Sequence, residues 1–351
     1  MAYRILILGA SYGSMLATKC AMAGHDVTLV CRRQTAELIN REGTEVRILL
    51  KGEDKHRAIR STTLPGRIDA SVPEQVEIDR YDLVVLAMQE PQYLAHAMRT
   101  LMVRIALAGI PCLSLMNMPP LAYLKRIPSI DAAAIEGAYT DPRLWDRFQP
   151  GKVTLCSPDP QAVRPEGEPA NVLHVGLATN FKAARFEDPA DTAILRKLEA
   201  DIDAVRLDGL DVPVKLRLHD SLFVPLAKWS MLMAGNYRCV LAGGGLRPIR
   251  EAVHGDIALS RAVYDHTCAI VQRMGGQASD LVPFEKYAAA AQSLLKPSSV
   301  ARAIAAGTPF VERVDRLVDA VSRSLGMPHA EISQTVNVLD RALAANRVAA
   351  A

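Results

Sequence analysis

Short runs of consecutive apolar residues recur through the first third of the chain, and residues at helical spacing separate them. The runs lie within residues 5–8, 24–33, 82–88 and 111–117. Strands that are buried on both faces of a parallel sheet have this uninterrupted apolar pattern. Strands alternating with helices are typical of α/β folds. The pattern therefore predicts a Rossmann-type α/β domain at the N-terminus.

The middle of the chain is rich in proline and glycine, and its apolar runs are shorter. Residues 152–156 and 172–177 are predicted to form short strands, and residues 212–218 alternate like an edge strand. Between them, apolar residues at helical spacing predict a helix that Asp191 could cap.

After residue 218 the pattern is helical and no strand is evident. We expect an all-α C-terminal domain, and we divide the chain into residues 1–210 and 211–351. Glycines are expected to end the first predicted helix at 243–245 and the third at 326. The predicted helices run from Asp220 or Ser221 to 241, from 247 to 274, from Ser298 or Ser299 to 325, and from 332 to 345.

The first strand leads into a glycine-bearing turn and a helix that begins near Ser14. Backbone N–H groups at a helix N-terminus favour an anion, and such a corner binds the diphosphate of a dinucleotide. Gly9, Ser11, Tyr12 and Gly13 form the candidate corner. In a G-x-G-x-x-G frame, Ser11 and Ser14 occupy the second and third glycine positions, so a purely structural βα turn is the alternative.

The second strand completes a β-α-β unit of the length that dinucleotide binding requires, and it ends at Arg32 and Arg33. An acidic residue at this position would bind the ribose 2′-hydroxyl of NAD, whereas arginine suits a 2′-phosphate. We therefore predict NADP(H) as the cofactor. The alternative is that both arginines are only solvated surface charge.

Ligands of open α/β sheets bind beyond the carboxyl ends of the strands. Met88 and Gln89 end one predicted strand, and Asn117 ends the next. These residues should face the cofactor, and the Asn117 amide could bond a ribose, a nicotinamide or a substrate oxygen. A turn-forming asparagine before prolines is the alternative for Asn117.

Lys228 lies within the apolar stretch of the first predicted C-terminal helix, and Asn236 follows eight residues later. A lysine among apolar residues is costly unless it meets a partner or water. Eight residues bring the two side chains within about a quarter turn of each other. Together they could bind a carbonyl oxygen and a carboxylate, although a snorkelling lysine on a buried helix is the alternative.

Composition excludes several other classes of function. The 351 residues carry 41 basic and 38 acidic side chains, a net charge of +3 that gives no case for nucleic-acid binding. The eight histidines form no metal-binding motif, and the six cysteines form no C-x-x-C pair. No apolar stretch is long enough to span a membrane and no signal sequence is evident, so we expect a cytoplasmic protein.

Taken together, the glycine corner, the G-H-x-V-T-L-V-x-R stretch at 24–32, Asn117 and the lysine with its downstream asparagine resemble the ketopantoate reductase family. These are 2-dehydropantoate 2-reductases of pantothenate biosynthesis, with a C-terminal domain of the 6-phosphogluconate dehydrogenase-like superfamily. The resemblance implies that Arg32 binds the NADP 2′-phosphate and that Asn117 serves cofactor and substrate.

The same resemblance implies roles for the C-terminal domain. Lys228 matches the family's catalytic lysine, Asn236 matches a substrate-binding asparagine, and Ser299 matches a serine that binds the substrate carboxylate or hydroxyl. The family's catalytic glutamate falls at Phe310 by spacing, and Glu312 is the nearby acid that we assign to substrate binding.

Other positions also depart from the family pattern. Gln89 replaces a lysine, Leu232 replaces the first helix asparagine, and Met118 replaces a glycine. The cofactor half of the resemblance is therefore stronger than the substrate half, and a bulkier or less polar substrate than the family's is consistent with these changes.

These observations predict an NADPH-dependent reductase that converts a 2-oxo acid, with ketopantoate the leading candidate, to a 2-hydroxy acid. Lys228 and Asn117 are the expected catalytic residues, and a homodimer is expected from the helical domain. One alternative is reduction of an imine formed from an amino acid and an oxo acid, as in opine-type dehydrogenases. Another is a non-catalytic regulator that binds NADP(H).

Overall fold

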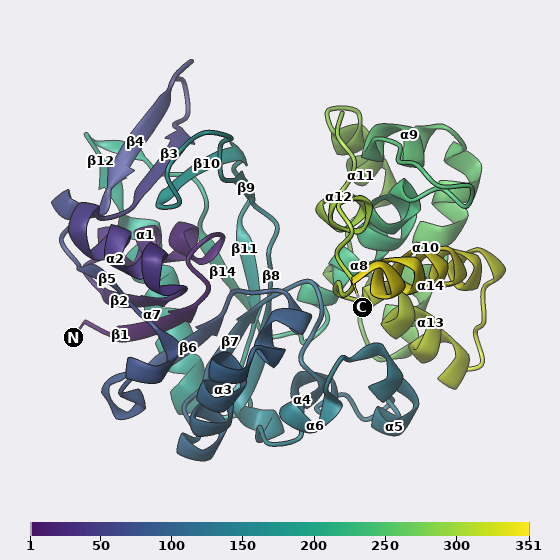
Figure 1. The fold of residues 1–351 in the computed structure, drawn as a ribbon, viewed down its shortest axis with the longest axis horizontal. Helices are drawn as coiled ribbons and strands as arrows, with labels where there is room; N and C mark the ends of the chain where they lie inside the picture. The colour runs from purple at the N-terminus through teal and green to yellow at the C-terminus, as the bar shows by residue number, and fades with distance from the viewer. Residues whose placement is uncertain (1, 351) are drawn as a thin grey trace. The chain divides into compact units, whose positions relative to one another are not determined.

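The computed structural model describes residues 2–350 and divides the chain into two compact units (Figure 1). The sheet unit comprises the chain up to Met88 together with Gln92–Tyr123 and Arg143–Asp220. The helical unit comprises Gln89–Pro91, Leu124–Pro142 and the chain from Ser221 onward. The segment before residue 143 thus adds two short pieces to the helical unit, which the sequence pattern did not indicate.

The sheet unit is built on an eight-stranded sheet of order β14-β11-β8-β7-β6-β1-β2-β5. Neighbouring strands are parallel except for β11, which runs antiparallel to β8. From β5 to β8 this is the Rossmann strand order. The chain adds strands on one side of β1 and then on the other, so the point at which the strand order reverses lies between β1 and β6. The predicted fold class is confirmed. The strands are β1 (Arg4–Leu8), β2 (Asp26–Val30), β5 (Ile68–Ser71), β6 (Leu83–Leu86), β7 (Cys112–Leu115), β8 (Val153–Ser157), β11 (Phe181–Ala184) and β14 (Leu216–His219).

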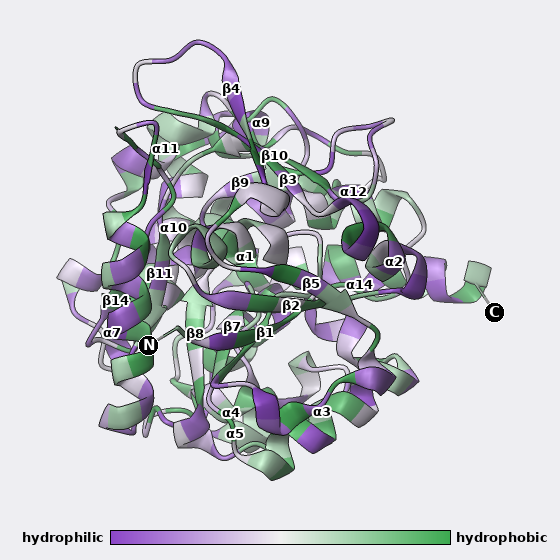
Figure 2. Cartoon of the chain, turned by 90° about the vertical axis from the view of Figure 1, so that its left-hand side faces the viewer, coloured by the Kyte–Doolittle hydropathy of each residue, from purple (hydrophilic) through white to green (hydrophobic). Residues whose placement is uncertain are grey.

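Helices cover this sheet with their apolar faces. They are α1 (Gly13–Met22), α2 (Arg33–Glu42), α3 (His96–Ala108) and α7 (Pro189–Ala204). Figure 2 shows alternating hydrophobic and hydrophilic turns along α3, in which Leu101, Met102 and Ile105 are buried. The predicted cap of α7 was wrong: Asp188 accepts the Ala190 N–H, whereas Asp191 lies in the first turn and pairs with Lys152 at 2.7 Å.

A second, four-stranded sheet of order β4-β3-β10-β9 belongs to the same unit. Strands β3 (Glu45–Leu49) and β4 (His56–Arg60) form an antiparallel hairpin. Strands β10 (Val172–Leu177) and β9 (Gln161–Val163) complete it. A two-stranded ribbon of β12 (Arg206–Leu207) and β13 (Leu210–Asp211) lies outside both sheets.

A buried lysine joins α1 to the chain before β14. Lys19 is 1% exposed, and its Nζ donates to the carbonyls of Val212 and Pro213, both at 3.1 Å. Burial, and next to it the positive charge of the nearby Lys215, together lower the pKa of Lys19 to about 7. This side chain therefore changes protonation near neutral pH in the folded protein.

The helical unit contains α8 (Lys228–Met231), a π-helical segment (Leu232–Asn236), α9 (Ile249–His254), α10 (Ile257–Arg273), α11 (Phe284–Ala291), α12 (Ser299–Ala305), α13 (Val314–Ser324) and α14 (Ala330–Ala350). The four-residue helix α5 (Ala132–Ile135) belongs to it as well. The short helices α4 (Leu121–Leu124) and α6 (Pro142–Trp145) lie where the chain passes from one unit to the other.

Three of the predicted long helices are interrupted. The first is a series of short 3₁₀, α and π segments from Val224 to Cys239. The second breaks at Gly255 and Asp256, where the Asp256 carboxylate accepts the Leu259 N–H and caps a new helix. The third ends after Ala305 at Gly307, whose positive φ of 83° terminates α12, and the chain becomes helical again at Val314.

Among residues 2–350, no helix combines the length and the apolar character needed to cross a membrane.

Candidate functional site

Two glycines shape the turn between β1 and α1. The Gly9 N–H donates to the Val30 carbonyl at 2.9 Å, and its φ of 112° is disfavoured for other residues. A Cβ at Gly9 would lie 2.7 Å from both the Ala87 carbonyl oxygen and the Met88 Cγ. A Cβ at Gly13 would lie 2.7 Å from the Ile7 Cγ2. Gly13 thus allows α1 to pack closely on β1, which is the task of the third glycine in the dinucleotide motif.

The other two corner residues differ in environment. Ser11 is exposed, and Tyr12 is half-buried with its Oη donating to the Pro160 carbonyl at 2.6 Å. Burial raises the pKa of Tyr12 well above its ordinary value, so the hydroxyl remains a donor. The N–H groups of Ser14 and Met15 bond back to Ser11 and Tyr12. These bonds occupy the N–H groups of Ser14 and Met15, so the Gly13 N–H and the helix dipole are what the start of α1 can offer to an anion.

Arginines gather at the end of β2. Arg32 precedes the first turn of α2 and Arg33 begins it, and both side chains are exposed. Arg164, which follows β9, lies within electrostatic range of Arg32 and Cys31. Burial lowers the pKa of Arg164, Cys31 opposes this effect, and the positive charge of Arg32 adds to the lowering. Nothing near Arg164 in the sequence indicated that it lies close to Arg32, because β9, a strand of the second sheet, brings it to the end of β2.

The remaining predicted cofactor residues follow β6 and β7, the two strands next to β1 on one side. The Met88 side chain contacts Gly9, and its N–H donates to the Tyr93 Oη at 3.1 Å. Gln89 is exposed and comes directly after Met88, and Asn117 is half-buried two residues beyond β7. Met88 and Asn117 therefore lie at the carboxyl edge of the sheet, where ligands of this fold bind, and Gln89 begins a short piece of the helical unit.

In the helical unit, Lys228 is the first residue of α8. The side chain of Lys228 is half-buried, and its neighbours Ala227 and Trp229 are 4% and 1% exposed. Asn236 ends the π segment and is half-buried. The predicted single helix from 220 to 241 is wrong, so the angle between these two side chains differs from that of a regular α-helix.

Ser298 connects the N-terminus of α12 to the end of the π segment. The Ser298 Oγ donates to the Asn236 carbonyl at 2.7 Å and accepts the Ala301 N–H at 3.2 Å. Ser298 is 3% exposed, whereas Ser299 is exposed in the first turn of α12. The backbone of Asn236 is thereby held next to the turn that carries Ser299. Sequence reasoning left the cap open between the two serines, and the structure assigns it to Ser298.

Glu312 belongs to a buried polar cluster. It is 6% exposed, and its Oε1 accepts the Glu90 N–H at 3.3 Å. The Tyr237 Oη donates to the Glu312 carbonyl at 2.8 Å and accepts the Val314 N–H at 3.1 Å. The Glu90 carboxylate in turn accepts from the Thr140 hydroxyl at 2.7 Å. Sequence reasoning did not anticipate Glu90, Tyr237 or Thr140 beside Glu312.

Two positions that depart from the pattern of the resemblance, Leu232 and Phe310, are apolar but differ in exposure. Leu232 is 3% exposed and Phe310 is 50% exposed. The buried Leu232 packs inside the helical unit, so it offers no polar group to a ligand. Phe310 presents an aromatic side chain on the surface of this unit.

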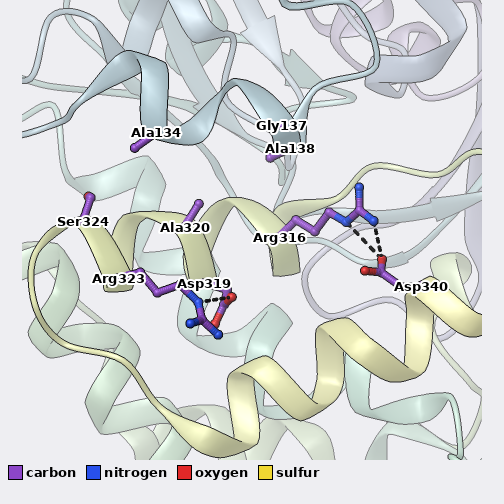
Figure 3. A pocket seen from close by; sticks show the side chains of 9 residues that line it. All are labelled: Ala134, Gly137, Ala138, Arg316, Asp319, Ala320, Arg323, Ser324 and Asp340. Atoms are coloured by element: carbon purple, nitrogen blue, oxygen red, sulfur yellow. Dashed lines mark hydrogen bonds and ion pairs between the residues drawn. The ribbon is translucent and has the colours of Figure 1, made fainter.

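A separate pocket of about 540 Å³ lies between the segment Ala132–Ala138 and helices α13 and α14 (Figure 3). Its two arginines are paired: Arg316 with Asp340 at 2.8 Å and Arg323 with Asp319 at 2.8 Å. None of the predicted site residues lines it. Across residues 2–350, no group of three or more His, Cys, Asp or Glu side chains could hold a metal ion.

The fold combines a Rossmann-type sheet with a helical C-terminal unit, and full-length solved structures share it. A 2-dehydropantoate 2-reductase from Methylococcus capsulatus is 14% identical, with a TM-score of 0.67 over 98% of this chain and 97% of that one. D-mandelate dehydrogenase, solved with NADH and anilino(oxo)acetate, is 13% identical, with a TM-score of 0.64 over 98% and 99% of the two chains.

A dimeric ketopantoate reductase from Staphylococcus aureus is 12% identical, with a TM-score of 0.60 over 98% of this chain and 99% of that chain. No protein-family model matches the sequence, and no curated protein matches it either. At these identities the similarity establishes the fold.

Proposed function

We propose that this protein is an NADPH-dependent reductase that converts a 2-oxo acid to a 2-hydroxy acid. One observation carries the proposal: the β1–α1 corner, where Gly9 and Gly13 keep the backbone clear at the reversal point of a Rossmann sheet. The solved structures with this fold include 2-oxo acid reductases and a dehydrogenase bound to NADH, which supports the same class of reaction here.

The residues present suit a dinucleotide. The Gly13 N–H and the helix dipole at the start of α1 would bind its diphosphate, with Ser11 and Tyr12 beside them. Met88, Gln89 and Asn117 follow the neighbouring strands and would contact the nicotinamide half. When bound, the cofactor supplies a hydride to the substrate carbonyl carbon.

The preference for NADPH over NADH is proposed from the arginines at the end of β2. Arg32 and Arg33 are exposed there, and Arg164 adds a third positive charge within electrostatic range of Arg32. A guanidinium can bind a phosphate through two hydrogen bonds, so this cluster suits the 2′-phosphate that distinguishes NADP from NAD.

The helical unit would bind and polarise the substrate. The Lys228 Nζ would hydrogen-bond the substrate carbonyl oxygen and donate a proton to it as the hydride arrives. Asn236 and Ser299 would hold the carboxylate, because the Ser298 bond keeps the Asn236 backbone beside the first turn of α12. Glu312 would keep the surrounding polar cluster in place through its bond with the Glu90 N–H.

Ketopantoate is the first substrate to test, and bulkier 2-oxo acids come next. The buried Leu232 and the half-exposed Phe310 replace polar groups that the resemblance implies, which favours a larger or less polar substrate. The same two positions motivate the second candidate reaction, reduction of an imine formed from a 2-oxo acid and an amine.

The test measures NADPH oxidation with ketopantoate, with aromatic 2-oxo acids, and with 2-oxo acids plus an amine. The Lys228→Met variant, which keeps an aliphatic side chain, is the control for each substrate. Turnover of an oxo acid alone that is lost in Lys228→Met would establish the proposed reaction. Turnover only with the amine would replace it with imine reduction, and NADPH binding without any turnover would indicate a non-catalytic regulator.

We also propose a homodimer, by analogy with the Staphylococcus aureus ketopantoate reductase that is described as dimeric. Sedimentation analysis of the purified protein tests it, and a monomer at assay concentration would contradict it. A cytoplasmic location stays a prediction from the sequence.

A further inference from the structure

The π-helical segment between Lys228 and Asn236 has an identifiable cause. In a regular α-helix the Met231 carbonyl would accept the N–H of Gly235, four residues later. Here the Oη of Tyr287, from α11, donates to the Met231 carbonyl at 2.9 Å. Burial raises the pKa of Tyr287, so its hydroxyl keeps the proton that it donates. A side chain inserted into the helical hydrogen-bond ladder is a known origin of local helix distortion.

Gly235 provides the space for this hydroxyl. A Cβ at residue 235 would lie only 2.0 Å from the Tyr287 Oη, which is far inside van der Waals contact. The Tyr237 N–H then donates to the Leu232 carbonyl five residues earlier, the spacing that defines a π-helix. Tyr287 and Gly235 therefore act together: the Tyr287 hydroxyl occupies the space that a side chain at residue 235 would need. We call this pair of residues the tyrosine wedge.

The wedge changes the direction of Asn236. In an α-helix, eight residues turn the chain about 80° beyond two full turns, so Lys228 and Asn236 would lie almost a quarter turn apart around the helix. A π segment is wider and turns through a smaller angle per residue, which reduces this excess. A π segment at 232–236 would therefore bring Asn236 closer to the helix face that carries Lys228. The Ser298 Oγ, which donates to the Asn236 carbonyl, would hold the backbone of Asn236 in that position.

We propose that Tyr287 is a positioning residue for substrate: its hydroxyl holds the 232–236 segment in the π form and so aligns Asn236 with Lys228. The kinetic consequences of this inference rest on the proposed function. The existence of the wedge can be tested without substrate, by measuring the stability of variants. Tyr287 is 6% exposed, and its ring stacks on Tyr264, so it acts from inside the helical unit rather than by touching substrate.

The stability experiment is a double-mutant cycle of Gly235→Ala and Tyr287→Phe, read by thermal and denaturant unfolding. Gly235→Ala alone should destabilise strongly, because its Cβ overlaps the hydroxyl. In the Tyr287→Phe background the same change should destabilise much less, because the hydroxyl is gone and helix propensity favours alanine. Additive effects of the two changes would overturn the wedge.

The kinetic experiment uses Tyr287→Phe with the oxo acid identified by the substrate panel. We expect the KM for that oxo acid to rise about tenfold, while the Kd for NADPH changes less than twofold. Asn236→Ala should reduce kcat/KM much less in the Tyr287→Phe background than in the wild type, because Asn236 has already turned away. Tyr264→Phe is the matched control, since its hydroxyl donates to Val282 at 2.7 Å.

The outcomes separate the two claims. Unchanged oxo-acid kinetics in Tyr287→Phe, or equal effects of Tyr264→Phe, would overturn the positioning role. A wild-type protein that reduces no oxo acid or imine would refute the proposed function, and the positioning claim with it. The stability cycle would still decide whether the wedge exists.

Discussion

The two units hold their candidate site residues by opposite means. In the sheet unit the corner depends on missing side chains, since a Cβ at Gly9 would collide with the two residues after β6, and one at Gly13 with Ile7 of β1. In the helical unit the residues are placed by hydroxyl groups that bond to backbone carbonyls: Tyr287 to Met231, Ser298 to Asn236 and Tyr237 to Glu312. Binding a diphosphate needs bare backbone, whereas orienting a small substrate needs placed side chains.

The comparison predicts that chemistry and cofactor binding can be separated by mutation. Lys228→Met should lower kcat by about 10²- to 10⁴-fold, the usual contribution of a general acid. The Kd for NADPH, measured by fluorescence titration, should stay within twofold, because the corner lies in the sheet unit. A variant that retains wild-type kcat would remove Lys228 from the mechanism.

Gly9→Ala should have the opposite effect, weakening the binding of NADPH rather than the chemical step. Its Cβ would meet the Ala87 carbonyl and the Met88 side chain at 2.7 Å, and its φ of 112° is disfavoured for alanine. Backbone strain of this kind costs about 1–3 kcal/mol, so we expect lower stability and about tenfold or greater weakening of NADPH binding.

The control for Gly9→Ala is Gly24→Ala. Gly24 also has a positive φ, of 84°, but a Cβ there would meet no atom within 4 Å. Equal losses of NADPH affinity in the two variants would mean that the crowding at Gly9 plays no part in forming the corner.

Arg164→Ala should lower the affinity for NADPH about tenfold and leave NADH binding unchanged, because only the former carries a 2′-phosphate. A tenfold loss corresponds to about 1.4 kcal/mol, which is typical of a charge-assisted hydrogen bond. Arg41→Ala, in the last turn of α2 where Arg41 pairs with Glu42, is the control. If Arg164→Ala weakens both cofactors equally, Arg164 does not read the phosphate.

The smallest predicted effect is the pH dependence of stability that arises from Lys19, a buried lysine of the sheet unit. Its pKa falls from 10.5 to about 7 on folding, so the unfolded chain binds more protons between these values. Stability should therefore rise with pH above 7, by at most about 1.4 kcal/mol per pH unit. Denaturant unfolding at pH 7.0 and 8.0 measures it, and Lys19→Met should flatten the slope.

The pH range in that experiment stays below the region where cysteines titrate. Burial raises the pKa of Cys20 to about 12, so above its ordinary value of 9.0 the unfolded chain loses this proton first and stability falls. A slope between pH 7.0 and 8.0 that persists unchanged in Lys19→Met would assign it to other groups.

Much of the sheet unit could be predicted because its signals are local. The residues Ile5–Leu8 are all 0% exposed. An uninterrupted run of apolar residues of this length is typical of a central strand that is buried on both faces of a parallel sheet. Gly9 indicated the corner by its position alone. Arg164 could not be found this way, since only the pairing of β9 with β10 brings its strand into the second sheet.

The helical unit was less predictable because tertiary contacts interrupt its helices. Nothing near Leu232 in the sequence indicates a π segment, since its cause is Tyr287 more than fifty residues later. Likewise Ser298 and Ser299 are both good helix caps by residue type, and the contact with Asn236 decides between them. Tertiary packing overrides local propensity at these positions.

The hydrogen bond from Tyr12 to the Pro160 carbonyl spans 148 residues of chain. The glycine corner is formed by neighbouring residues of the chain, yet the partner of its Tyr12 hydroxyl is translated 148 residues later. A growing chain that has not reached Pro160 would therefore have the corner residues without this hydrogen bond. The closure of a loop this long is entropically costly and slow to form. The contact between Tyr12 and Pro160 is thus expected late in folding, although Tyr12 is translated long before its partner.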